Sequence, residues 1–180
     1  MSKVTAAEYV GLDGVVEAPQ WTAPFWSEDL ATAQKDLLFA NDALLLGRVT
    51  YEGFAAAWPS MTDEAGFAER MNSMPKHVAT RTLTDLEWNA TALPGDAVDA
   101  VRELKERGDD TNYLIYGSPT LVNALLPHGL VDEYRLMTFP VVVGSGRRLF
   151  DEGPAATLRL VDSWMTTTGV AMLSYAPAVQ

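Results

Sequence analysis

The chain has 180 residues, 48% of them apolar, which fits one domain, residues 1–180, with a sizeable core. Its net charge of −11 argues against a nucleic-acid partner, and the lack of cysteine excludes disulfides and thiolate metal ligands. No apolar run approaches the length of a membrane span and the N-terminus does not resemble a secretory signal, so we expect a cytoplasmic protein with no membrane partner.

The first segment predicts a strand and a turn. Residues 3–10 carry apolar side chains in a strand-like pattern, and Leu12-Asp13-Gly14 then ends the strand in a turn. The chain becomes extended again at residues 15–16.

Three aromatic residues, Trp21, Phe25 and Trp26, gather in and just after the proline-containing loop at residues 17–25. Such a cluster either covers a planar ligand as a lid or packs on the core as a plug. We assign the three residues to a substrate pocket, and the plug remains open as the alternative.

A helix is expected from the cap Ser27 to about residue 40. Glu28 and Asp29 fall in its first turn, where the helix dipole favours acids. Apolar residues then recur at helical spacing, which predicts one buried face.

The stretch DALLLGRVTYEGFAAAWP, residues 42–59, organises the chain. Its short apolar run is typical of a strand buried on both faces, and Gly47 then turns the chain into a helix that stops before Pro59. A helix start after a buried strand presents backbone N–H groups to anions, Arg48 adds a planar set of donors and Thr50 adds a hydroxyl. We therefore expect a nucleotide phosphate at this turn; an ordinary strand–turn–helix joint is the alternative.

The rest of the chain continues to alternate helices and strands before it changes to strands alone. We expect helices at residues 63–72, 96–108 and 118–127, and strands at 76–80, 87–91, 113–116, 133–139, 141–143, 157–164 and 169–176. This order predicts an α/β fold with a mixed, mainly parallel sheet flanked by helices and antiparallel strands at the C-terminus.

A second strand-to-helix corner occurs at Gly117-Ser118, with Ser118 expected as the helix cap and Pro119 as the first helical residue. Parallel strands end at one edge of their sheet, so this corner and the one at Gly47 are expected to lie on the same edge, where ligands bind in open α/β sheets. Thr80, Arg81 and Thr82 follow another strand and are a further candidate phosphate contact.

Metal chemistry has little support in the sequence. The two histidines, His77 and His128, have no metal-ligand spacing, and we predict no metal site. The glycine-rich segment 144–148 is not followed by a helix, so a tight turn between strands is favoured over a dinucleotide fingerprint.

Five motifs together resemble the dihydrofolate reductase-like superfamily, and most closely the bacterial proteins related to the reductase domain of the riboflavin-biosynthesis deaminase-reductase. They occur in family order over nearly the whole chain and read LDGVVE, DALLLGRVTYEGFAAAWP, MPKHVATRTL, YGSPTLVNALLPHGLVDEYRL and FPVVVGSGRRLF. The family often has two glycines where this chain has Gly117-Ser118.

The resemblance implies NADPH as hydride donor, a small-molecule substrate with an unsaturated C=N or C=O bond, such as a pterin- or pyrimidine-like heterocycle, and a homodimer. It places the cofactor phosphates, the adenosine 2′-phosphate and the nicotinamide beside residues from four motifs: Leu12, Asp13, Gly14, Gly47, Arg48, Thr50, Thr80, Arg81, Thr82, Gly117, Ser118, Thr120 and Leu121.

The catalytic acid is the least defined part of this interpretation. In dihydrofolate reductases a carboxylate in the first long helix supports protonation, and among Glu28, Asp29 and Asp36 we select Asp29 because it lies at the helix start near the aromatic loop. Water is the alternative proton source, and acids that only complement the helix dipole are the alternative role. A non-catalytic binding protein on the same fold is the rival function.

Overall fold

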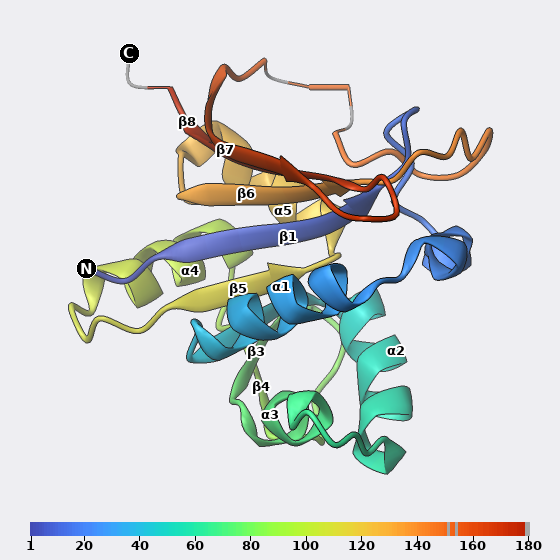
Figure 1. The fold of residues 1–180 in the computed structure, drawn as a ribbon. Coiled ribbons are helices and arrows are strands. Elements are labelled where there is room, and N and C mark those ends of the chain that lie inside the picture. Colours follow the sequence, from blue (N-terminus) through green and yellow to red (C-terminus); the bar gives the residue numbers. More distant parts are fainter. Residues whose placement is uncertain (151, 154, 179–180) are drawn as a thin grey trace.

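Eight strands form one sheet in the order β4-β3-β2-β5-β1-β6-β8-β7 (Figure 1). The computed structural model describes residues 1–150, 152–153 and 155–178. The strands are β1 Val4–Val10, β2 Ala43–Gly47, β3 Lys76–Ala79, β4 Ala90–Ala92, β5 Tyr113–Tyr116, β6 Glu133–Thr138, β7 Leu158–Met165 and β8 Ala171–Pro177. The helices are α1 Glu28–Phe39, α2 Arg48–Ala57, α3 Phe67–Ser73, α4 Ala97–Glu106 and α5 Pro119–Leu125.

The first six strands are parallel and the last two are antiparallel. β1 lies between β5 and β6, β2 lies between β3 and β5, and β8 pairs antiparallel with both β6 and β7. This arrangement confirms the predicted fold class.

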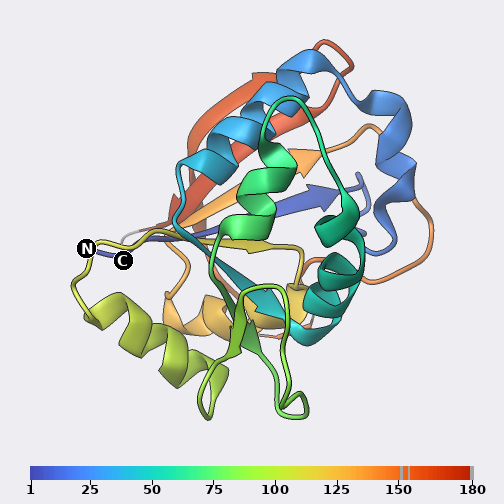
Figure 2. The ribbon, with the colours of Figure 1, turned by 90° about the horizontal axis from the view of Figure 1, so that it is seen from below.

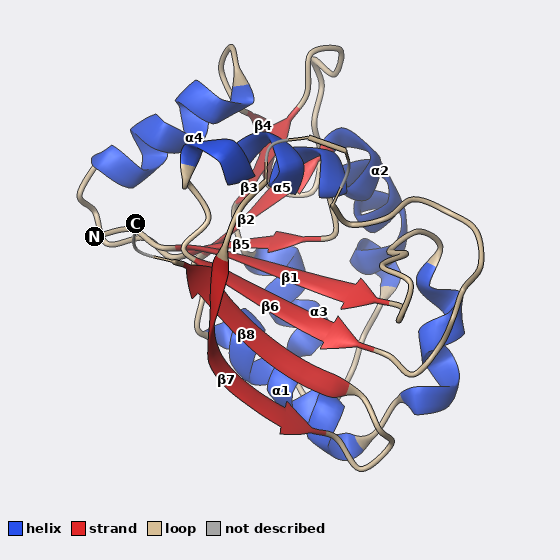
Figure 3. Cartoon of the chain, turned by 90° about the horizontal axis from the view of Figure 1, so that it is seen from above, coloured by secondary structure: helices blue, strands red, loops and turns tan. Residues whose placement is uncertain are grey.

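Helices cover both faces of the sheet (Figures 2 and 3). Seen from above, α4 and α5 lie over one face, and seen from below, α1, α2 and α3 lie over the other. Each layer has its own apolar core, because strand side chains alternate between faces: Ala43 and Leu45 join the α4–α5 core, whereas Leu44 and Leu46 join the α1–α3 core. No helix in the described parts of the chain is long and apolar enough to cross a membrane.

Local sequence signals explain where α1 and α4 begin. Ser27 accepts a hydrogen bond from the Leu30 amide, and Asp96 accepts hydrogen bonds from the Val98 and Asp99 amides. Both caps lie where the sequence predicts them.

Several predicted boundaries are wrong for identifiable reasons. The helix expected at 63–72 begins only at Phe67, because Gly66 has a φ of 77° and breaks the helical path. The strand expected at 87–91 is reduced to Ala90–Ala92, because Trp88 and Asn89 both have positive φ.

The apolar run 141–143 is not a strand. Pro140 precedes it, and the Val141 carbonyl accepts a hydrogen bond from the Leu12 amide at 2.8 Å. The segment therefore packs beside the turn that follows β1 instead of extending the sheet.

The aromatic cluster divides between the two predicted roles. Trp21 and Phe25, in a short 3-10 helix at Pro19–Phe25, pack edge-on against the fully buried ring of Phe139. Trp26 is 44% exposed and packs against Tyr9. Trp21 and Phe25 are thus a plug on the core, and only Trp26 faces the cleft described next.

Candidate functional site

A cleft of about 1500 Å³ opens at the edge of the sheet where the parallel strands end. It exists because the sheet splits there: β1 and β5 pair no further than Ala7 and Tyr116, whereas β1 and β6 stay paired to Val10 and Thr138. Residues after the ends of β2, β3 and β5 therefore surround one opening, as ligand sites in open α/β sheets do.

The two glycine corners touch each other at this opening. The Gly47 amide donates to the Ser118 hydroxyl at 2.8 Å, and the Ser118 amide donates to the Thr50 hydroxyl at 3.1 Å. Gly117 has a φ of 52°, and a Cβ there would lie 3.4 Å from the Thr50 hydroxyl oxygen. The corners, far apart in sequence, are thus one hydrogen-bonded unit.

Ser118 does not cap α5 as predicted. Its backbone is left-handed, with φ 55° and ψ 50°, and its hydroxyl donates to the Tyr116 carbonyl at 3.0 Å while it accepts from Gly47. The side chain is buried between the two corners. The Ser118 hydroxyl therefore joins the two corners at the edge of the cleft.

Cationic side chains surround the glycine corners. Arg48, Arg81 and Arg147 line this side of the cleft, which we call the cationic half. α2 begins without a side-chain cap, so its first amides are not taken by a side chain. Arg48 is half-exposed and pairs with Glu52 at 2.9 Å, an exposed i,i+4 contact that a phosphate can displace.

The structure brings most of the predicted cofactor residues to the cleft. Ten of them line it: Gly47, Arg48, Thr50, Thr80, Arg81, Thr82, Gly117, Ser118, Thr120 and Leu121. The Thr80 hydroxyl accepts from the Thr82 and Leu83 amides, which fixes the turn that carries Arg81.

The turn residues Leu12, Asp13 and Gly14 do not line the cleft. Leu12 is 62% exposed, and the Asp13 carboxylate accepts from the Gly144 amide at 2.8 Å, a hydrogen bond that lowers the pKa of Asp13. This turn supports the 141–149 segment, and Val16 and Glu17 from the same motif reach the cleft instead.

Asp29 also lies outside the cleft. Its carboxylate accepts from the Ser27 hydroxyl, from the Leu30 amide at 3.0 Å and from the Thr167 amide at 2.7 Å. These hydrogen bonds, with the Ser27 hydroxyl as the largest contribution, lower the pKa of Asp29. Asp29 joins the start of α1 to the β7–β8 turn, a position that does not suit a proton donor to a ligand in the cleft.

The side of the cleft formed by α1, α2 and α3 is aromatic, and we call it the aromatic half. Its apolar lining consists of Trp26, Phe54, Trp58, Phe67, Met71 and Met137. The rings of Phe54, Trp58 and Phe67 form a chain of contacts, with centroids 6.4 and 5.5 Å apart. Such rings offer flat faces to a planar ligand.

Polar but uncharged groups lie at the floor of the aromatic half. The Gln34 amide nitrogen donates to the Tyr9 hydroxyl at 3.0 Å, while Gln34 Oε1 and the Tyr116 hydroxyl have no hydrogen-bond partner among the described residues. Burial raises the pKa of both tyrosines, so both stay neutral. Buried unpartnered polar atoms that line a cleft are candidates for ligand contacts.

Glu8 is a cleft residue that the sequence reasoning missed. It is only 2% exposed, lines the cleft, and its Oε1 finds no partner in the described part of the chain. Burial raises its pKa well above the usual range, so the acid is kept neutral. The sequence did contain a sign of this residue, because Glu8 is the single acid in the otherwise mainly apolar strand VTAAEYV.

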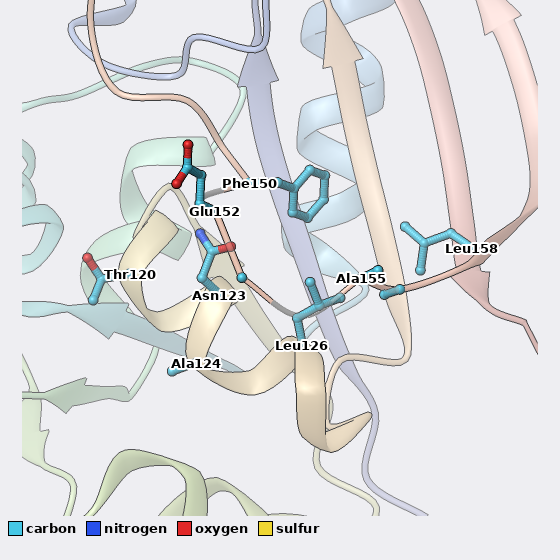
Figure 4. A pocket seen from close by; sticks show the side chains of 10 residues that line it. Thr120, Asn123, Ala124, Leu126, Phe150, Glu152, Ala155 and Leu158 are labelled. Atoms are coloured by element: carbon cyan, nitrogen blue, oxygen red, sulfur yellow. The ribbon is translucent and has the colours of Figure 1, made fainter.

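A second, smaller cavity of about 610 Å³ lies between α5 and residues 150–158 (Figure 4). It shares Thr120 and Ala124 with the large cleft, and Asn123 on its wall is bonded to the Pro119 and Leu149 carbonyls. Within the described ranges, no group of three or more histidine or acidic side chains is arranged to hold a metal ion.

Comparison with known families identifies the chain. The model of the RibD C-terminal domain matches residues 2–172. The chain belongs to the RibD C-terminal domain family. Within this family it is similar to two Bacillus subtilis (strain 168) proteins named as uncharacterized: YyaP, 28% identical over 92% of this chain and 90% of the relative, and YwjB, 27% identical over 79% of each.

Solved structures share the fold, which confirms the predicted resemblance. A putative riboflavin biosynthesis protein from Shewanella sp. PV-4 superposes with a TM-score of 0.80 at 20% identity, over 98% of this chain and 99% of that one. A pyrimidine reductase-like protein from Corynebacterium diphtheriae gives 0.71 at 12% identity, over 99% and 92%. The Thermotoga maritima diaminohydroxyphosphoribosylaminopyrimidine deaminase/5-amino-6-(5-phosphoribosylamino)uracil reductase gives 0.69 at 16% identity, over 98% of this chain but 57% of that protein.

Substitution of Ser118 tests the unit formed by the two corners. Ser118→Ala removes the hydroxyl and leaves the Gly47 amide unpartnered, which is expected to lower the free energy of unfolding by about 1–3 kcal/mol. Ser118→Gly loses the same hydrogen bonds but relieves the left-handed backbone, so it is expected to be at least as stable as the alanine variant. Urea unfolding measures both, and a glycine variant that unfolds at lower urea than the alanine variant would contradict this account.

The raised pKa of Glu8 predicts a pH-dependent stability. Above the unfolded-state pKa of about 4.3, the unfolded chain releases this proton and the folded protein keeps it, so stability falls as pH rises until the folded pKa is reached. Relative to Glu8→Gln, the unfolding equilibrium constant of the wild type is expected to rise about tenfold per pH unit within this window. Urea unfolding across the neutral range measures it, with Glu106→Gln as matched control, and parallel pH curves for wild type and Glu8→Gln would contradict it.

Proposed function

We propose that residues 1–180 act as one domain, an NADPH-dependent reductase that transfers a hydride to an unsaturated C=N or C=O carbon of a small pterin- or pyrimidine-like heterocycle. The observation that carries the proposal is the joined pair of glycine corners with arginines beside them, opening onto an aromatic half in the same cleft. Family membership and the reductase names of two structural neighbours support the reaction class.

The cationic half fits a phosphorylated dinucleotide. Gly117 adopts a left-handed φ of 52° that favours glycine, and the start of α2 offers backbone amides next to Arg48. Arg81 and the Thr80 and Thr82 hydroxyls fit the adenosine 2′-phosphate at the end of β3. The local cations offset the unfavourable field of a chain with a net charge of −11.

NADPH supplies the hydride when bound; the protein supplies binding, orientation and a partly closed pocket. Trp26 and Trp58 shield one side of the ligand from water, while Gln34 and Tyr116 offer it an acceptor and a neutral hydroxyl. Because Asp29 is bonded outside the cleft, we assign the proton to water or to Glu8. Glu8, whose pKa is raised by burial, can donate its proton to the nitrogen or oxygen that becomes anionic when the hydride adds, and the carboxylate left behind is then reprotonated from water.

Binding measurements test the cofactor assignment. Arg48→Ala and Arg81→Ala are each expected to weaken NADPH by about tenfold or more, because each removes a charge-assisted contact to phosphate. Arg81→Ala, at the 2′-phosphate, is expected to weaken NADH less, whereas Arg48→Ala is expected to weaken both coenzymes. Tryptophan quenching titrations measure both dissociation constants, and Arg102→Ala, an exposed arginine on α4, is the matched control. Equal losses of NADPH and NADH affinity in Arg81→Ala would count against a contact to the 2′-phosphate. If the wild-type protein binds neither coenzyme, the cofactor assignment is wrong.

We also propose a homodimer. β7 is an edge strand with exposed apolar side chains, among them Val161 and Met165 at 52% and 61% exposure. A second copy of the chain packed against this strand would bury these side chains. Sedimentation analysis is expected to show a dimer at micromolar concentration, and Val161→Lys is expected to dissociate it. A wild-type protein that sediments as a monomer would exclude this arrangement.

A further inference from the structure

The two halves of the cleft differ in what they offer a phosphate group. The cationic half has three arginines, Arg48, Arg81 and Arg147, against two acids, Glu17 and Asp96, and it has a helix start without a side-chain cap. The charged side chains lining the aromatic half within the described chain are Glu28, Lys35 and Asp63, two acids and one base. The balance of charge is thus reversed between the halves.

The helix starts of the aromatic half are already occupied by carboxylates. Asp63 accepts from the Phe67 amide at 3.0 Å and from the Ala68 amide at 2.6 Å, which takes the first amides of α3. Asp29 and Ser27 take the Leu30 amide at the start of α1 in the same way. Amides at a helix start can bind phosphate, but in the aromatic half these amides already donate to side chains of this protein.

Lys35 does not compensate for these acids. Its ammonium lies 5.6 Å from the centre of the Phe39 ring, and Glu28 and Asp63 line the same half of the cleft. A phosphate monoester carries a charge of about −1.5 to −2 at neutral pH. One lysine facing two acids leaves this half unfavourable for such a group.

The remaining contacts suit a flat neutral molecule. Phe54, Trp58 and Trp26 provide ring faces, and the floor provides the unpartnered Gln34 Oε1 as acceptor and the Tyr116 hydroxyl as donor. A heterocycle that carries both N–H and C=O groups can hydrogen-bond to these two atoms. Burial keeps the floor free of charge, so it selects hydrogen bonding over ion pairing.

We propose that the aromatic half takes a planar, uncharged heterocycle that carries no phosphate. The proposal rests on the proposed function in assigning the cationic half to the dinucleotide. It separates this chain from the Thermotoga maritima neighbour, whose name gives a phosphoribosylamino compound as substrate. The chain would then share the fold of that protein and act on a different class of molecule.

A ligand series that differs only in the appended group tests the proposal. Protein saturated with NADP⁺, so that the cationic half is filled, is titrated with lumichrome, riboflavin and FMN while tryptophan emission is followed. We expect lumichrome and riboflavin to bind at least about fivefold more tightly than FMN, because a charge held about 4 Å from a like charge in water costs about 1 kcal/mol. FMN binding as tightly as riboflavin, or no binding of any of the three, would overturn the proposal.

A charge placed in the aromatic half provides the converse test. Thr32 is an exposed residue of α1 that lines the cleft, and Thr32→Arg is expected to raise the affinity for FMN at least about fivefold while riboflavin changes little. Trp58→Ala is expected to weaken all three ligands, and Trp164→Ala, on β7 outside the cleft, is the matched control. An equal gain for riboflavin and FMN in Thr32→Arg would contradict an electrostatic origin.

Failure of the proposed function is distinguishable in the same experiment. If NADP⁺ does not bind, the cofactor assignment fails, and the ligand series is repeated with Arg48→Ala/Arg81→Ala, in which phosphate binding to the cationic half is weakened. A preference for riboflavin over FMN in that variant supports the aromatic half as an uncharged site by itself. A preference for FMN there overturns it.

Discussion

The hydrogen bond from the Gly47 amide to the Ser118 hydroxyl is the contact on which the cleft depends. It joins the end of β2 to the end of β5, and the return bond from the Ser118 amide to Thr50 fixes α2 against the same corner. These bonds stabilise a left-handed backbone at Ser118 that costs about 1–2 kcal/mol in isolation. Two helix starts are thereby held beside one opening with little room for movement.

The rest of the site follows from how helix starts are satisfied. Asp29, Asp63 and Asp96 occupy the first amides of α1, α3 and α4, whereas α2 starts without a side-chain cap. A helix start must find hydrogen-bond acceptors from somewhere, so carboxylates supplied by the chain exclude external anions. The start of α2 beside Arg48 therefore keeps amides that no side chain takes, whereas the first amides of α3 are taken by Asp63, although both helices border one cleft.

Buried polar groups give the cleft its remaining chemistry. Glu8, Gln34 and Tyr116 line the cleft, and each keeps an atom without a partner among the described residues. Unpartnered buried atoms reduce stability, and they persist where a ligand completes them. Burial raises the pKa of Glu8 and of Tyr116, which favours the uncharged form of both side chains.

The sequence by itself determined the α/β fold and both glycine corners, because these follow from local rules: apolar runs, glycine breaks and helix caps. The resemblance to a known family selected thirteen candidate cofactor residues, ten of which line the cleft. Only the tertiary structure decided which side chains face the opening. Asp29 satisfied the local rule for a helix start and was then bonded by Thr167, a residue distant in sequence. Glu8 looked like an irregularity in a strand until the divergence of β1 from β5 left it lining the cleft. Capping and periodicity act over a few residues, whereas the direction and hydrogen bonding of a side chain depend on contacts between distant segments.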